Sequence, residues 1–250
     1  MALVSTELSE NLASVRERIR AAASRAGRAA EEITLIAVSK THSARKIQML
    51  QQAGVRHFGE NRVQERESKQ LQLAGLDAVW HMIGHLQKNK AERAATLFDS
   101  VDSLDNIALA SKLDRARGEL LAATVHAAPP TLSGARNPLR ILIEVKLDPE
   151  PAKSGVQVEE VPKLVEALRR MSNLDLRGLM GVPPYFDDPE EARPYFRMLR
   201  ESRDAARAQF GPDILPVLSM GMSHDFETAI EEGATEIRVG TALFGSREIG

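Results

Sequence analysis

Short apolar runs alternate with amphipathic stretches along most of the chain. The apolar runs are rich in β-branched residues, which is typical of buried strands. The stretches between them place apolar residues at helical spacing, and several end at a glycine, such as Gly27 or Gly54. Strands are predicted at 33–39, 56–59, 78–83, 97–101, 139–147, 174–179, 214–218 and 236–239. Helices are predicted at 5–26, 44–53, 62–73, 89–96, 105–123, 158–171, 189–209 and 226–232, with a helical turn from Thr241.

This alternation predicts the fold class. Strands that each lead into a helix favour a parallel sheet covered by helices. Eight such units within 250 residues match the size of a (β/α)8 TIM barrel, while a doubly wound open sheet, the alternative, usually has fewer strands. The Pro- and Gly-containing run from His126 to Pro138 interrupts the pattern without ending it. We therefore expect an insertion within a single domain spanning residues 1–250 rather than a linker between two domains.

The amino-acid composition excludes several classes of protein and site. Hydrophobic residues make up 43% of the chain, so a folded core is expected. The 33 Lys and Arg residues nearly balance the 35 Asp and Glu residues, which gives no electrostatic signature of nucleic-acid binding. There is no cysteine, which excludes disulfides and thiolate metal sites. Without a signal-peptide core or an apolar run of membrane-spanning length, a soluble cytoplasmic protein is expected.

Candidate chemistry lies where strands end, because active residues of such barrels sit at the carboxyl ends of their strands. Lys40 ends the first strand, and a partly desolvated lysine is more readily a neutral nucleophilic amine. Gly240 and Thr241 follow the last strand, where free amides and a close backbone approach suit a phosphate, and Ser223 can add a hydroxyl. A solvated lysine and ordinary turn residues remain the alternative interpretations.

Arg238 lies on the last strand and faces the barrel interior if Val239 faces the helices. A buried arginine needs a partner, and an ion pair with Glu144 is the alternative to a ligand contact. Asn61 either contacts a ligand ring or caps the helix after it. His81 and His85 have metal-ligand spacing only on a helix, and Gly84 between them argues against one, so they are expected to line the mouth or bind backbone groups.

An amine, a guanidinium and an anion cradle together suit an aldehyde that carries a phosphate. The same residues lie in blocks that resemble the pyridoxal-phosphate homeostasis proteins (YggS or PROSC type). The matching blocks are AVSKTH with Lys40, HFGENRVQE from His57, WHMIGHLQKNK from Trp80, KSGV from Lys153, SMGMSHDFETAI from Ser219 and RVGTALFGSR from Arg238. The resemblance implies the barrel of the alanine-racemase N-terminal domain and binding of pyridoxal 5′-phosphate (PLP) without an established catalytic reaction.

The resemblance also assigns roles to residues. It implies that Lys40 forms a Schiff base with PLP, that Arg238 hydrogen-bonds the pyridine nitrogen, and that Ser223, Gly240 and Thr241 hold the phosphate. Asn61 falls in the block that lines the ring pocket. The chain departs from some relatives at Arg62, where a tyrosine is common, and in the insertion from His126.

Arginine keeps the pyridine nitrogen unprotonated, which makes PLP a weaker electron sink than a carboxylate partner would. Alanine racemases share such an arginine but also use a tyrosine from an added β domain of the partner subunit, and this chain ends at Gly250. We therefore expect a monomer that holds PLP and delivers it to apo-enzymes. A PLP-dependent amino-acid racemase is the alternative, and a class I aldolase without cofactor is a third interpretation.

Overall fold

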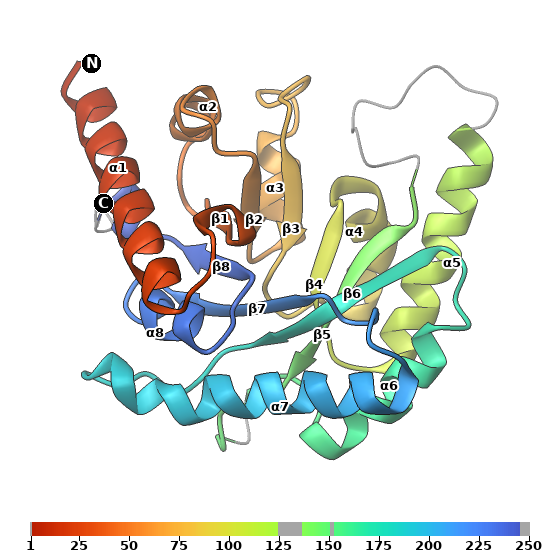
Figure 1. Ribbon diagram of the computed structural model, residues 1–250. Helices are drawn as coiled ribbons and strands as arrows, with labels where there is room; N and C mark the ends of the chain where they lie inside the picture. The colour runs from red at the N-terminus through yellow and green to blue at the C-terminus, as the bar shows by residue number, and fades with distance from the viewer. Residues whose placement is uncertain (1, 125–136, 151–152, 246–250) are drawn as a thin grey trace.

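Eight parallel strands close into a barrel, and helices surround it (Figure 1). This computed structural model describes residues 2–124, 137–150 and 153–245. The strands are β1 (Thr34–Val38), β2 (His57–Glu60), β3 (Val79–Met82), β4 (Ser100–Leu104), β5 (Leu139–Val145), β6 (Leu174–Gly181), β7 (Val217–Met222) and β8 (Glu236–Val239). Each strand pairs with the next, and β8 returns to β1 with Arg238 opposite Ile36. The predicted TIM barrel is confirmed, and an open sheet is excluded.

Helices follow the strands as the amphipathic pattern predicts. The α-helices are α1 (Ala2–Arg25), α2 (Ala44–Gln52), α3 (Val63–Lys69), α4 (Ala91–Leu97), α5 (Ile107–Thr124), α6 (Val161–Leu168), α7 (Arg193–Phe210), α8 (Phe226–Glu231) and α9 (Thr241–Phe244). Short 3-10 turns occur at η1 (Ala30–Glu32), η2 (Lys88–Lys90), η3 (Val158–Glu160) and η4 (Pro189–Ala192). In Figure 1, α1 runs beside α8, where Arg18 Nε lies 3.1 Å from a Glu227 carboxylate oxygen. Among the described residues, no helix combines the length and apolar character needed to cross a membrane.

The barrel has a different composition on its two sides. Outward-facing strand residues such as Ala37, Trp80 and Val239 are buried against the helices in one large apolar core. Inside the barrel, the apolar side chains Leu142, Met180 and Val217 form a small separate cluster. Charged and polar side chains occupy much of the remaining interior, as described below.

Several predicted boundaries were wrong by a few residues. The first helix was predicted from Ser5 but begins three residues earlier, at Ala2. The α5 helix was predicted from Asp105 but begins at Ile107, after Asn106, whose Oδ1 accepts a hydrogen bond from Leu109 N at 2.8 Å. Strands β4 and β7 each begin three residues later than predicted, because the apolar residues before them belong to helix ends and connections. The predicted insertion from His126 lies outside the described residues except for its last positions.

Candidate functional site

The predicted site residues gather at the carboxyl end of the barrel on adjacent strands. Lys40 follows β1 and Asn61 follows β2, while Arg238 lies on β8. Because β8 closes the barrel onto β1, residues some 200 positions apart in sequence become neighbours. Gly240 lies over β1, since a Cβ built on it would be 3.5 Å from Val38 Cβ.

Ser223 joins the two loops that were predicted to hold a phosphate. Its Oγ accepts hydrogen bonds from Gly240 N at 3.1 Å and from Ala242 N at 3.3 Å. The backbone amides at the start of α9 therefore point toward the loop after β7. Donors that converge in this way on a small acceptor are the kind of group that binds a phosphate oxygen.

The loop that carries Ser223 depends on one glycine. Gly221 has φ +90°, and a Cβ built on it would lie 2.6 Å from Ala229 Cβ. Asp225 fixes the same loop, because its carboxylate accepts a hydrogen bond from Met222 N at 2.6 Å. Only glycine allows the strand to turn this tightly onto α8.

Arg238 faces the barrel interior, as its alternation with Val239 predicts. Its guanidinium donates to Ser219 Oγ at 2.8 Å and to the Gly181 carbonyl at 2.9 Å. The structure gives it these partners in place of the ion pair with Glu144 that sequence reasoning offered as an alternative. Burial lowers the pKa of Arg238, and the carboxylates of Asp102 and Asp225 act in the opposite direction.

Lys40 is half-buried and lies in a turn at the end of β1. His42 N donates to Ser39 O at 3.1 Å to close this turn, and Thr41 takes the positive φ of 65°. The His42 ring stacks on Phe244 of α9, with ring centroids 4.2 Å apart and planes 11° from parallel. The lysine turn and the helix after Gly240 are thus in direct contact.

Asn61 borders a cavity of about 710 Å³ between the loops after β2 and β3. Arg62, His85 and Lys90 also line this cavity. Gly84 packs directly against the Asn61 backbone, since a Cβ built on Gly84 would be 2.4 Å from Asn61 O. His85 lies at the rim, where its Nδ1 is 3.2 Å from Ser154 Oγ.

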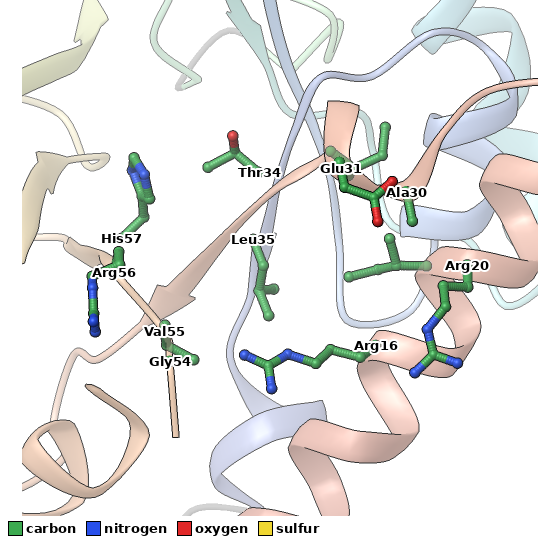
Figure 2. Close-up of a pocket in the computed structure, with 12 residues that line it drawn as sticks. Arg16, Arg20, Ala30, Glu31, Thr34, Leu35, Gly54, Val55, Arg56 and His57 are labelled. Carbon is green, nitrogen blue, oxygen red and sulfur yellow. The ribbon is translucent and has the colours of Figure 1, made fainter. Parts of the chain in front are cut away.

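A second cavity, of about 450 Å³, lies at the opposite end of the barrel (Figure 2). It is bordered by Thr34 and His57 at the starts of β1 and β2, and by Arg16 and Arg20 of α1. Lys40 follows the other end of β1, so this cavity is not part of the predicted site.

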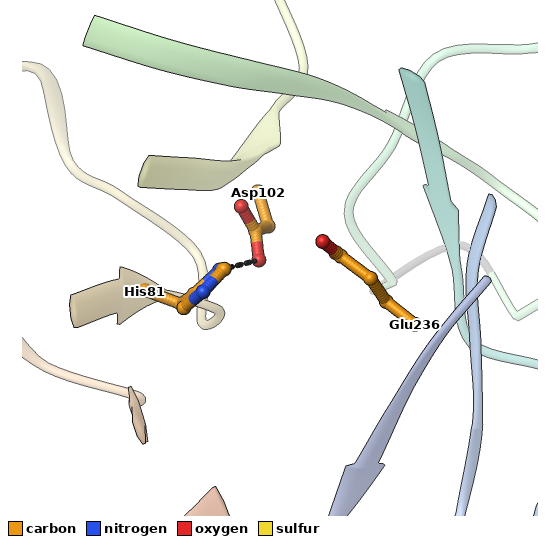
Figure 3. Close-up of side chains that lie close together, drawn as sticks. All are labelled: His81, Asp102 and Glu236. Atoms are coloured by element: carbon orange, nitrogen blue, oxygen red, sulfur yellow. Dashed lines mark hydrogen bonds and ion pairs between the residues drawn. The ribbon is translucent and has the colours of Figure 1, made fainter. Parts of the chain in front are cut away.

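Sequence reasoning missed a polar network inside the barrel. His81 Nε2 lies 3.0 Å from His57 Nδ1, and His81 Nδ1 lies 2.9 Å from an Asp102 oxygen. Glu236 pairs with Arg140 in the same space, and Figure 3 shows its carboxylate close to His81 and Asp102. Polar and apolar residues alternate over short stretches of these strands, as at Ser100 and Asp102 of β4 or Glu236 and Arg238 of β8, and that alternation was the signal in the sequence.

The pKa values in this network differ between the two histidines. Burial, with help from the charge of His81, lowers the pKa of His57 to about 3. Burial also opposes charge on His81, but Asp102 beside it leaves the pKa of His81 raised. The Asp102 carboxylate thus favours the charged form of His81, whereas burial and the neighbouring His81 disfavour the charged form of His57.

The network has the residue types of a metal site. One ligand atom each from His81, Asp102 and Glu236 lie within 4.8 Å of one another, and all three residues are buried. Both nitrogens of His81 already have protein partners, and Arg140 places a cation on Glu236. The cluster is thus an internal ion-pair network beneath Arg238 rather than an open set of metal ligands.

Comparison with known proteins supplies the family. Residues 11–248 match the family model described as "Alanine racemase, N-terminal domain". The pyridoxal phosphate homeostasis protein of Aquifex aeolicus is 41% identical over 241 residues, which cover 96% of this chain and 98% of that protein. The chain belongs to the pyridoxal phosphate homeostasis family. The resemblance noted in the sequence is thereby confirmed.

Solved structures agree with this membership. PipY of Synechococcus elongatus, solved with PLP bound, superposes with a TM-score of 0.79 at 37% identity and covers 96% of this chain and 100% of its own. An alanine racemase of Clostridium difficile gives a TM-score of 0.67 at 15% identity, and the match covers 97% of this chain but 57% of the racemase. At this low identity, the similarity to the racemase shows only that the two proteins share the barrel fold.

Proposed function

We propose that this protein binds PLP at the carboxyl end of its barrel, holds it covalently through Lys40, and releases it to PLP-dependent apo-enzymes. The whole chain acts in this proposal as one cytoplasmic, monomeric cofactor-binding domain. When bound, PLP supplies an aldehyde carbon that a neutral primary amine can attack.

One observation carries the proposal: an amine, a buried guanidinium and a pair of converging amides surround one barrel mouth. Ser223 Oγ and the amides of Gly240 and Ala242 fit a phosphate. The inward guanidinium of Arg238 fits the unprotonated pyridine nitrogen, to which it can only donate. Asn61 borders the cavity between the loops after β2 and β3, and we assign it to the side of the PLP ring. Thr241 follows the end of β8. PipY, a relative at 37% identity, was solved with PLP.

The same residues argue against a dedicated catalytic reaction. Arg238 keeps its proton, so it does not protonate the pyridine nitrogen and draws little electron density from the ring. Carbanion chemistry is then restrained, while exchange of one amine for another remains available. This is the behaviour expected of a carrier that gives up its cofactor intact.

The experiment is the visible absorption spectrum of the purified protein mixed with PLP, before and after borohydride, for wild type and Lys40→Ala. We expect wild type to be yellow, and borohydride to fix the cofactor irreversibly on Lys40. Lys40→Ala should bind without a covalent product. A wild type that takes up no PLP contradicts the proposal.

The alternative function, an amino-acid racemase-like enzyme, rests on the shared barrel and the shared arginine. Incubation of the PLP-loaded protein with single enantiomers of amino acids distinguishes it from the carrier. Racemisation that disappears in Lys40→Ala favours the enzyme, and transfer of PLP to an apo-enzyme without racemisation favours the carrier.

A further inference from the structure

The turn that presents Lys40 has an unfavourable backbone conformation. Thr41 has φ +65°, a region that a β-branched residue rarely adopts. Such a conformation costs about 1–2 kcal/mol per residue, so the surrounding structure must hold it in place. The hydrogen bond from His42 N to Ser39 O, 3.1 Å long, closes the turn.

The ammonium group of Lys69 binds the same Ser39 carbonyl from outside the barrel. Lys69, the last residue of α3, places its Nζ 2.9 Å from Ser39 O and 2.8 Å from Glu60 Oε1. Ser39 Oγ also donates to Glu60 Oε1 at 2.8 Å. Lys69, Glu60 and Ser39 therefore form a clamp at the point where β1 becomes the lysine turn.

The clamp is buried, so its charged groups are stable only while they remain paired. The Glu60 side chain is 0% exposed and that of Lys69 is 12% exposed. Burial raises the pKa of Glu60, and the hydrogen bond and charge of Lys69 oppose that rise. Glu60 Oε2 has no hydrogen-bond partner among the described residues, so loss of Lys69 would leave the hydroxyl of Ser39 as the hydrogen-bond donor to this carboxyl.

The direction of side chains along β1 connects the clamp to the site. Successive residues of an extended strand end point to opposite faces. Ser39 faces Glu60 and Lys69 of α3 on the outer side. From this alternation we infer that the next residue, Lys40, faces the barrel mouth. The hydrogen bonds to the Ser39 carbonyl fix the orientation of the peptide plane between Ser39 and Lys40.

We propose that Lys69 is a positioning residue for Lys40: through Ser39 and Glu60 it fixes the turn so that the Lys40 amine meets the aldehyde carbon of PLP. This inference rests on the proposed function. Lys69 itself touches no ligand. Its effect is confined to the covalent capture step and leaves the noncovalent contacts of phosphate and ring in place.

The test compares two ligands that differ only at the reacting carbon. PLP can bond to Lys40, whereas pyridoxine 5′-phosphate carries an alcohol there and cannot. Titrations of the full-length protein with each ligand, and the rate at which the PLP absorbance changes on mixing, are measured for wild type, Lys69→Met and Lys69→Arg. We expect Lys69→Met to weaken PLP binding and slow its capture about tenfold, with pyridoxine 5′-phosphate affinity within about twofold.

Two controls keep the test decisive. Lys69→Arg retains a cation and should restore most of the PLP binding. Arg28→Met removes a comparable contact far from the mouth, where Arg28 Nη1 donates to Ala234 O at 2.7 Å and Ile230 O at 3.2 Å. That variant should keep wild-type binding of both ligands. If Lys69→Met does not fold, Glu60→Gln tests the same clamp.

Two results would overturn the inference. Equal weakening of both ligands in Lys69→Met would mean that Lys69 supports the whole mouth, and unchanged binding of both would mean that the turn holds itself. If the wild type binds PLP no more tightly than pyridoxine 5′-phosphate, Lys40 does not capture PLP covalently. That result contradicts the proposed function itself.

Discussion

Glu144 should make the stability of this protein fall as pH rises toward neutrality. Its side chain lies on β5 at the barrel mouth, and its Oε2 is buried without a hydrogen-bond partner among the described residues. Burial raises the pKa of Glu144 from 4.5 to about 7, Asp105 adds to the rise, and Arg238 opposes it. Replacement by glutamine keeps the size and polarity of the side chain but removes the ionisation.

The sign of the effect follows from proton binding. Between about pH 4.5 and about pH 7, the folded state holds a proton on Glu144 that the unfolded state has released. The free energy of unfolding therefore falls as pH rises through this window, and the full penalty is present above about pH 7. At about 1.4 kcal/mol per pH unit, the pKa difference corresponds to at most roughly 3–4 kcal/mol, and relaxation around the charged form lowers the penalty to about 1–3 kcal/mol.

Urea unfolding of wild type and Glu144→Gln at about pH 5 and about pH 8 measures this difference. We expect the two proteins to have similar stability near pH 5 and the variant to be more stable by about 1–3 kcal/mol near pH 8. Glu159→Gln, at an exposed position, is the matched control and should show no such trend. A difference between wild type and Glu144→Gln that stays constant with pH would refute the reasoning.

Three further predictions follow from the loops at the barrel mouth. Ser223→Ala removes the hydroxyl that accepts hydrogen bonds from the amides of Gly240 and Ala242. Titrations should then show about tenfold weaker affinity for PLP and unchanged affinity for pyridoxal, which lacks the phosphate. Equal loss of affinity for both ligands would contradict the phosphate role. Gly221→Ala should lower the free energy of unfolding by at least about 2 kcal/mol in urea, because its φ is +90° and the new Cβ has no space; a neutral substitution would contradict this. Thr41→Gly relieves a strained φ but increases the conformational entropy of the unfolded chain, so we expect the free energy of unfolding to rise by less than about 1 kcal/mol. We also expect slower capture of PLP on mixing. Capture at the wild-type rate would mean that Thr41 does not restrain Lys40.

The errors in the predicted elements have physical causes. Strand β1 and helix α2 were predicted almost to the residue, because β-branched runs and the stop at Gly54 are local signals. Strand β7 was predicted at 214–218 but occupies Val217–Met222. Apolar content alone could not distinguish a connection packed under a helix from a strand, since both are buried.

For the site, the strand ends that carry Lys40, Asn61 and Arg238 could be predicted, because active groups of this fold lie at carboxyl ends. The inward direction of Arg238 also followed from simple alternation. Its partners did not, because Ser219 and the Gly181 carbonyl bind it in place of Glu144, the alternative partner considered from the sequence. The roles assigned to the phosphate-binding residues remain predictions.

The sequence by itself determined the βα alternation, the barrel and the polar strand ends, because these depend on residue spacing within short segments. Only the tertiary structure decided which buried charges meet. Arg140 and Glu236 lie 96 positions apart, and Lys69 reaches Ser39 from a different βα unit. Such contacts depend on strand register and on closure of β8 onto β1, and a buried charge is stable only where that geometry supplies its partner.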